Sequence, residues 1–317
     1  MGLDSAPALE LSGVAKSYDS FQAVKPLDLV VPRGATYGLL GPNGAGKTTT
    51  IRMIMRILPP DGGEIRVLGQ PLAQKGLDRI GYLPEERGVY KRMKVRALLS
   101  FFGELKGVRP RDTRARIDRW LERLDLLDRA EAPLQELSKG MQQKVQFIGS
   151  IVHEPDIVIL DEPFSGLDPI NQRVLREIID ELRTEGRTLI FSTHIIEHAE
   201  RLCDHVCIIA RGTKVADGSL AEVKRRHGSE YVRIRVAGSS AELAQRLKQT
   251  GLVEQIREHG SEVEVGLADG ADPQRLLEEL VASGIPVRRF EVAEPSLEQV
   301  FIERVGGVQP AAEAIHV

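Results

Sequence analysis

Short apolar runs separated by glycine and proline make up the first part of the chain. Leu9 to Val14, Leu27 to Val31 and Thr36 to Leu40 have the length and composition of strands. A helix is predicted to begin at Lys47 and run toward Leu58, where the sequence Pro-Pro-Asp-Gly-Gly ends it. Ile80 to Leu83 is predicted to be another short strand. We therefore expect a sheet-rich start to an α/β domain.

Helical periodicity replaces the strand pattern from about Val95 to Leu127. Apolar residues recur there at helical spacing, at Leu98, Leu99, Phe102, Leu105, Ile117, Trp120, Leu121 and Leu124. This pattern predicts a helical insertion. The chain then alternates between a strand at Ile157 to Leu160, a helix at Ile170 to Leu182 and a strand at Thr188 to Phe191. Such alternation predicts a parallel sheet with helices on both faces.

A second, smaller domain begins near Ser219. Its predicted elements have the order βαββαβ with a short final helix, at Tyr231 to Val236, Ala241 to Lys248, Val253 to Arg257, Glu262 to Gly266, Pro273 to Ala282, Val287 to Val292 and Ser296 to Arg304. We expect residues 1–218 to form one domain, with a helical subdomain at about 86–155. Residues 219–305 are expected to form a small ferredoxin-like α+β domain, followed by a frayed tail at 306–317.

Composition and charge narrow the class of protein. The chain has 43 Lys and Arg against 46 Asp and Glu, a formal net charge of −3, which argues against a highly basic nucleic-acid binder. The longest strictly apolar run is five residues, Val206 to Ala210, whereas a membrane-spanning helix needs about twenty. The N-terminus has neither the basic segment nor the apolar stretch of a signal peptide. We therefore expect a cytoplasmic chain.

A phosphate-binding loop lies between the third strand and the first helix. The pattern G-x-x-x-x-G-K-[ST] is matched by Gly41, Pro42, Asn43, Gly44, Ala45, Gly46, Lys47 and Thr48. The glycines allow backbone N–H groups to turn toward phosphate oxygens at a helix N-terminus that favours anions. Lys47 is predicted to bridge the β- and γ-phosphates and Thr48 to hold Mg²⁺, and we include Thr49 among the nucleotide-binding residues. The loop predicts a nucleoside triphosphatase.

Two adjacent acids follow the apolar strand at Ile157 to Leu160. Asp161 and Glu162 lie at its carboxyl end, where ligands of open α/β sheets bind. Asp161 is predicted to orient Mg²⁺ through its water shell. Glu162 is predicted to accept a proton from the attacking water, or to polarise it.

The chain now resembles the ATP-binding subunits of ABC transporters, from about Leu9 to Asp217. The most specific segment is Leu-Ser-Lys-Gly-Met-Gln-Gln at 137–143, which is similar to the signature segment of that family. It departs from the usual Leu-Ser-Gly-Gly-Gln-Gln at Lys139 and Met141. Ser138 and Gly140 remain, and their hydroxyl and backbone N–H can reach a phosphate at the start of a helix.

Weaker matches occur in the order that the family has. Tyr18 lies where an aromatic residue stacks on adenine. Ser-Gly-Leu-Asp at 165–168 resembles the loop that communicates between paired subunits, and His194 resembles the histidine that touches the γ-phosphate. Taken alone, Tyr18 is also compatible with an ordinary strand-edge aromatic residue and His194 with a helix-cap histidine.

Glu85 departs from the family, which usually has glutamine at this point. A carboxylate can approach Mg²⁺ or the attacking water, but it adds negative charge beside ATP and donates no hydrogen bond while ionised. We therefore place Glu85 among the catalytic and metal-binding candidates and hypothesise altered metal coupling with activity retained. The segment Gly81 to Gly88, together with the C-terminal domain, resembles the exporter branch that includes sodium-extrusion-like pumps.

The resemblance implies an energy-coupling ATPase subunit with ATP and Mg²⁺ as cofactors. It implies that two copies pack head to tail, that the pair drives separate membrane-spanning subunits, and that the chain is peripheral on the inner face of the membrane. An alternative is a soluble ABC-type ATPase that acts on nucleic acid or ribosomes. The single cassette and the lack of a basic or aromatic-rich face argue against that alternative, so we expect no nucleic-acid partner. A GTPase switch would carry an Asn-Lys-x-Asp segment, which is not found.

Overall fold

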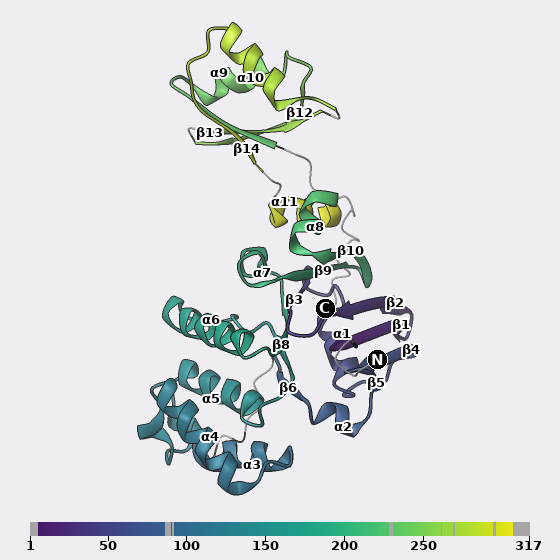
Figure 1. The fold of residues 1–317 in the computed structure, drawn as a ribbon, viewed down its shortest axis with the longest axis vertical. Coiled ribbons are helices and arrows are strands. Elements are labelled where there is room, and N and C mark those ends of the chain that lie inside the picture. Colours follow the sequence, from purple (N-terminus) through teal and green to yellow (C-terminus); the bar gives the residue numbers. More distant parts are fainter. Residues whose placement is uncertain are drawn as a thin grey trace, which may run out of the picture. The chain divides into compact units, whose positions relative to one another are not determined.

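A computed structural model describes residues 6–85, 90, 92–227, 231–260, 262–268, 270–293 and 296–306. Contacts divide the chain into two compact units, the N-terminal unit Met1–Gly218 and the C-terminal unit Ser219–Val317. Figure 1 shows their elements. The predicted tail after Gly306, the first five residues and Glu86 to Gly88 of the exporter-like segment lie outside the described residues. Within the described ranges, no helix combines the length and apolar character needed to cross a bilayer.

The strands at the start of the N-terminal unit form a sheet of their own. This sheet has the order β2-β1-β4-β5, and its pairings are antiparallel. Its strands are β1 (Leu9–Tyr18), β2 (Phe21–Val31), β4 (Gly62–Val67) and β5 (Gln70–Pro71). The last two were not predicted, because only Ile65 and Val67 of β4 are buried while Glu64 is exposed.

The second sheet of this unit has six strands in the order β10-β9-β3-β8-β7-β6. Its strands are β3 (Thr36–Leu40), β6 (Ile80–Leu83), β7 (Ile157–Asp161), β8 (Thr188–Thr193), β9 (His205–Ala210) and β10 (Thr213–Ser219). The parallel pairings run from β9 through β3, β8 and β7 to β6, as the alternation of strand and helix predicted. Every residue of β3, β7 and β8 is buried, which explains their continuous apolar runs.

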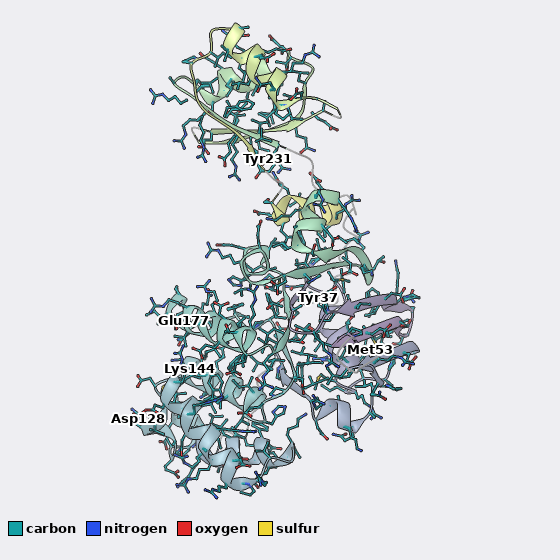
Figure 2. All side chains as sticks on the ribbon, viewed as in Figure 1. Tyr37, Met53, Asp128, Lys144, Glu177 and Tyr231 are labelled. Atoms are coloured by element: carbon teal, nitrogen blue, oxygen red, sulfur yellow. The ribbon has the colours of Figure 1, made fainter. Side chains whose placement is uncertain are left out.

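The segments that connect these strands contain helices α1 (Lys47–Ile54), α2 (Gln74–Leu77), α6 (Pro169–Thr184) and α7 (Ile196–Leu202). Helix α1 ends at Ile54, four residues before the predicted Leu58, and Arg56 has a left-handed backbone with φ of 53°. One core joins residues of both sheets and α1. It contains Tyr37 and Met53, which Figure 2 labels. The antiparallel sheet and the six-stranded sheet are therefore one packed unit.

The predicted helical insertion consists of α3 (Val95–Leu105), α4 (Pro110–Arg123) and α5 (Lys139–Ile151), with 3-10 turns at Leu127–Arg129 and Leu134–Glu136. These helices lie together, apart from the antiparallel sheet (Figure 1). Buried apolar residues at the predicted helical spacing, such as Leu98 and Ile117, hold them together. Strand β6 packs against α5.

Gly81 permits that packing, and Gly81→Ala is expected to destabilise the N-terminal unit. A Cβ at Gly81 would lie 2.0 Å from the carbonyl oxygen of Ser150 on α5. Backbone must move to relieve this contact, at a cost of about 1 to 3 kcal/mol. A lower urea midpoint would show it. Gly76→Ala on α2 is the control, because its nearest neighbour would be at 3.5 Å, an ordinary contact. Equal midpoints for the two variants would contradict this account of the packing.

The C-terminal unit has its elements in the order βαββαβ between two further helices. They are α8 (Leu220–His227), β11 (Tyr231–Val236), α9 (Ser240–Leu247), β12 (Val253–His259), β13 (Glu262–Leu267), α10 (Pro273–Ala282), β14 (Val287–Ala293) and α11 (Leu297–Gly306). The sheet is antiparallel with the order β12-β13-β11-β14. A separate core, which includes Val232, Ile234, Leu243 and Leu276, lies between the sheet and helices α9 and α10.

Candidate functional site

The loop between β3 and α1 requires glycine at three positions, Gly41, Gly44 and Gly46. Gly44 and Gly46 have φ values of 75° and 110°, in the region that side chains rarely adopt. A Cβ at Gly46 would lie 2.7 Å from the carbonyl oxygen of Ala23, and one at Gly41 would lie 2.3 Å from that of Ile209. The neighbouring strands thus press the loop into a tight turn immediately before the N-terminus of α1.

Lys47 begins α1 and is 6% exposed. Its Nζ donates to the carbonyl oxygens of Gly41 at 2.7 Å and Pro42 at 3.1 Å, so the amine lies along the inside of the loop. Burial lowers the pKa of Lys47, and three carboxylates oppose this by raising it: Glu162, Asp161 and Glu85. The charged amine is therefore held beside a cluster of acids rather than in solvent.

Asp161 is buried at the end of β7 and contacts two hydroxyl groups. Thr48 Oγ1 donates to Asp161 Oδ1 at 3.3 Å, and Ser192 Oγ on β8 donates to the same oxygen. Asp161 Oδ2 is buried and, among the described residues, has no hydrogen-bond partner. Burial raises the pKa of Asp161. A buried carboxylate oxygen without a partner, next to a threonine hydroxyl, fits the oxygen ligands that Mg²⁺ prefers.

Glu162 is 8% exposed and has a left-handed backbone, with φ of 47°. Its N–H lies 3.1 Å from Ser192 Oγ, which accepts the hydrogen bond. Its carboxylate Oε1 lies 2.9 Å from His194 Nδ1 and 3.8 Å from Lys47 Nζ. Left-handed backbone at a residue other than glycine persists only where the surroundings enforce it, so these contacts fix where the carboxylate points.

One cavity of about 350 Å³ brings the loop, Lys47 and Glu162 together with the aromatic residues of the first hairpin, whereas Asp161 and His194 are not among its lining residues. Its lining residues are Tyr18, Phe21, Ala23, Asn43, Gly44, Ala45, Gly46, Lys47, Thr48, Thr49, Glu85 and Glu162. Tyr18 and Phe21 pair across the β1–β2 turn and are 44% and 58% exposed. The structure thus assembles Tyr18, the loop, Glu85 and Glu162, which lie up to 144 positions apart (162 − 18) in the chain.

Ser138 and Gly140 lie elsewhere and do not line this cavity. Ser138 is the N-cap of α5, where its hydroxyl accepts from the N–H of Met141 at 3.3 Å. Ser138 and Lys139 are exposed, and the start of α5 therefore faces away from the protein interior. Leu137 and Gln143 of the signature segment are buried.

Sequence reasoning missed two residues that contact the site. Phe21 begins β2, and the presence of a second aromatic residue three positions after Tyr18 was a usable signal in the sequence. Ser192 holds both Asp161 and the backbone of Glu162. Nothing in the sequence indicated this role, because no local pattern predicts a contact between side chains on two strands.

Comparisons with known proteins give family matches for both parts of the chain. Residues 24–165 match the family model "ABC transporter", and residues 218–305 match "ATP-binding protein DrrA1-3-like, C-terminal domain". The chain is 42% identical over 300 residues to the uncharacterised ABC transporter ATP-binding protein YhaQ of Bacillus subtilis, covering 95% of this chain and 99% of that one. It is 35% identical to the Nod factor export ATP-binding protein I of Rhizobium sp. strain N33, covering 95% and 98%.

A solved structure of an ATP-binding subunit of an ABC transporter superposes with a TM-score of 0.66 at 31% identity, covering 76% of this chain and 99% of that one. An ATPase that acts on nucleic acid or ribosomes, the alternative from the sequence, is not supported by these comparisons. The chain belongs to the ABC transporter ATP-binding proteins, which are ATPases coupled to transport.

Proposed function

We propose that the cavity binds MgATP, with the phosphates in the loop of residues 41–48 and the adenine against Tyr18. The observation that carries this proposal is the single cavity lined by Tyr18, the loop, Glu85 and Glu162. Backbone N–H groups at the start of α1 and the buried Lys47 amine supply the positive charge that phosphates need. Phe21, exposed beside Tyr18, offers a second aromatic face for the base.

Thr48 and Asp161 would hold Mg²⁺, with Glu85 as a further candidate. Support comes from the unpartnered Asp161 Oδ2 and from the 3.3 Å contact between Thr48 Oγ1 and Asp161 Oδ1. When bound, Mg²⁺ would neutralise charge on the β- and γ-phosphate oxygens. Ser192 holds Asp161 Oδ1, so the carboxylate is oriented before any ligand arrives.

Glu162 would act as the general base for the attacking water. Its carboxylate is oriented by His194 Nδ1 at 2.9 Å, and Lys47 Nζ lies 3.8 Å away. His194 is 46% exposed, so it can also contact a γ-phosphate from the open side of the site. A carboxylate held this way can receive a proton at Oε2 while Oε1 keeps its contact with the histidine.

Two copies would complete each site. ATP-binding subunits of ABC transporters act as dimers with membrane partners. In the proposed head-to-tail pair, Ser138 and Gly140 of one copy cover the γ-phosphate held by the loop of the other. The exposed start of α5 supports this, because a helix N-terminus supplies N–H groups to an anion from the side that the loop leaves open.

Export is the proposed direction of transport, on the basis of the relative named for Nod factor export and the DrrA-like C-terminal match. The partner would be a membrane-spanning subunit bound at a cavity of about 270 Å³ beside α3, lined by Phe102 and Leu105. Leu105 is 67% exposed, and the exposed ring of Phe101 contacts both Phe102 and Tyr90, which extends the apolar surface next to the cavity. The same cavity is lined by Tyr82, Leu83 and Pro84, which lead directly to Glu85 in the ATP cavity.

Co-purification from membranes tests this partner. The wild-type chain should retain a multi-spanning membrane protein after detergent extraction, and Leu105→Asp should lose it while binding ATP normally. Ile57→Asp is the matched control, because Ile57 is 62% exposed and does not line the cavity beside α3. Recovery of RNA or ribosomes with both variants, and of no membrane protein, would contradict the proposal.

Glu85→Gln is expected to change the Mg²⁺ dependence of ATP hydrolysis with activity retained. Removing one negative charge from a cavity that already contains Glu162 weakens the attraction for the cation, and the amide gains a hydrogen-bond donor. Titration of the hydrolysis rate with Mg²⁺ should give a half-saturating concentration several-fold higher, about 3- to 10-fold. If both that concentration and the turnover rate equal those of the wild type, Glu85 has no role in metal coupling.

A further inference from the structure

Phe164 lies two residues after Glu162, and its ring contacts two other aromatic rings. Its ring packs against His198 on α7 with centroids 4.4 Å apart, and edge-to-face against Phe191 on β8 at 6.4 Å and 87°. Phe164 is 3% exposed and His198 is 8% exposed. These three rings join β8, α7 and the segment that carries the general base.

The backbone on either side of Phe164 is held from a third element. Gln143 on α5 is buried, and its Nε2 donates to the carbonyl oxygens of Pro163 and Ser165, both at 3.4 Å. Helices α5 and α7 therefore both contact the segment that follows Glu162. The ring of Phe164 is thus held by Phe191 and His198, and the carbonyl oxygens on either side of it are held by Gln143.

The contacts of Phe164 matter for catalysis because the backbone of Glu162 is strained. The φ of 47° at Glu162 is unfavourable for a residue other than glycine, and the following segment adds to the contacts that hold it, because the N–H of Ser165 donates to the carbonyl oxygen of Glu162 at 3.1 Å. If Phe164 were free to move, Glu162 would relax and its carboxylate would leave His194 Nδ1. A displacement of about 1 Å in a reacting group can cost up to about 10²-fold in rate.

Among the residues that contact this segment, His198 is the one best suited to substitution, because its side chain acts as a neutral ring. Its Nδ1 is buried without a hydrogen-bond partner among the described residues. Burial lowers the pKa of His198; Arg176 and Arg201 lower it further, while Glu197 and Glu162 oppose them. The ring therefore contributes its aromatic face rather than a charge or a hydrogen bond through Nδ1.

We propose that His198 is a positioning residue for ATP hydrolysis, which acts by packing its tilted ring against Phe164 and thereby holding the Glu162 carboxylate against His194. This inference rests on the proposed role of Glu162 as general base. It predicts that an aromatic side chain without nitrogen replaces His198, whereas an aliphatic side chain of similar size does not.

Two matched variants, His198→Phe and His198→Leu, test the inference. His198→Leu should lower kcat about 10-fold with unchanged ATP affinity, and His198→Phe should keep the wild-type kcat. His198→Phe should also be at least as heat-stable as the wild type, because it removes an unpartnered buried nitrogen. Circular dichroism and ATP binding by calorimetry establish that both variants are folded.

A readout without nucleotide completes the test. The imidazole resonance of His194, observed with labelled histidine and assigned by its loss in His194→Gln, should move in His198→Leu and stay in place in His198→Phe. A wild-type kcat and an unmoved resonance in His198→Leu would overturn the inference. Glu162→Gln is run beside them: if it leaves turnover unchanged, the general-base assignment fails, whereas normal His198→Leu together with slow Glu162→Gln defeats only the positioning role.

Discussion

Glu162→Gln is expected to slow ATP hydrolysis by about 10² to 10⁴-fold while ATP still binds. Glutamine keeps the size of the side chain and can still accept a hydrogen bond from His194 at the position of Oε1, which lies 2.9 Å away. It cannot accept a proton from water. The loop and Lys47 are untouched, so the nucleotide should remain bound and hold the pair of subunits closed. Phosphate release measures the rate, and size-exclusion chromatography with ATP measures the trapped dimer.

Glu122→Gln provides the matched control for that experiment. Glu122 lies on α4, is exposed, and does not line the ATP cavity. It should hydrolyse ATP at the wild-type rate. Rapid turnover by Glu162→Gln would show that another group accepts the proton, and loss of ATP binding would show that Glu162 contributes to the site mainly through its charge.

Lys47→Ala is expected to weaken ATP binding by about 10² to 10³-fold, which corresponds to the loss of a buried charged hydrogen-bond partner. The amine is 6% exposed and lies against the carbonyl oxygens of Gly41 and Pro42. Phosphates entering the loop would meet that amine, and alanine offers nothing in its place. Calorimetry of the purified variant with ATP and Mg²⁺ gives the affinity directly.

Folding of this variant is not expected to suffer, because burial of the amine opposes its charged form. A thermal unfolding midpoint near that of the wild type would confirm the point. Lys25→Ala on β2 is the control, since Lys25 is exposed and outside the cavity. Equal ATP affinity for Lys47→Ala and Lys25→Ala would mean that the phosphates do not lie in the loop.

The fold was predictable where a buried strand appears in the sequence as a continuous run of apolar residues. The run at Ile157 to Leu160 became β7, which is buried on both faces. The strand β4 has no such run, because only Ile65 and Val67 are buried and the half-buried Arg66 lies between them. Nor did the sequence indicate that β1 and β2 would form a separate sheet with β4 and β5, since pairing between distant strands is set by packing rather than by local pattern.

In the site, too, local motifs were predictable and contacts between distant residues were not. The loop at Gly41 to Thr48 was predictable because its chemistry is contained in eight consecutive residues. The hydrogen bond between Ser192 and Asp161 joins residues 31 positions apart (192 − 161). The ring contact between His198 and Phe164 joins residues 34 positions apart (198 − 164). The left-handed backbone of Glu162 had no signal either, because no glycine or asparagine marks it.

The shared ATP site between two copies is tested most directly by cross-linking one copy to another. Asn43 in the loop and Lys139 in the signature segment are both exposed, and the two native cysteines are buried. One preparation would carry Asn43→Cys and a second Lys139→Cys, each combined with Glu162→Gln. After mixing, ATP, Mg²⁺ and a mild oxidant should produce a disulfide-linked dimer that neither preparation forms alone. If the mixture stays monomeric on a non-reducing gel with ATP bound, the head-to-tail arrangement is wrong.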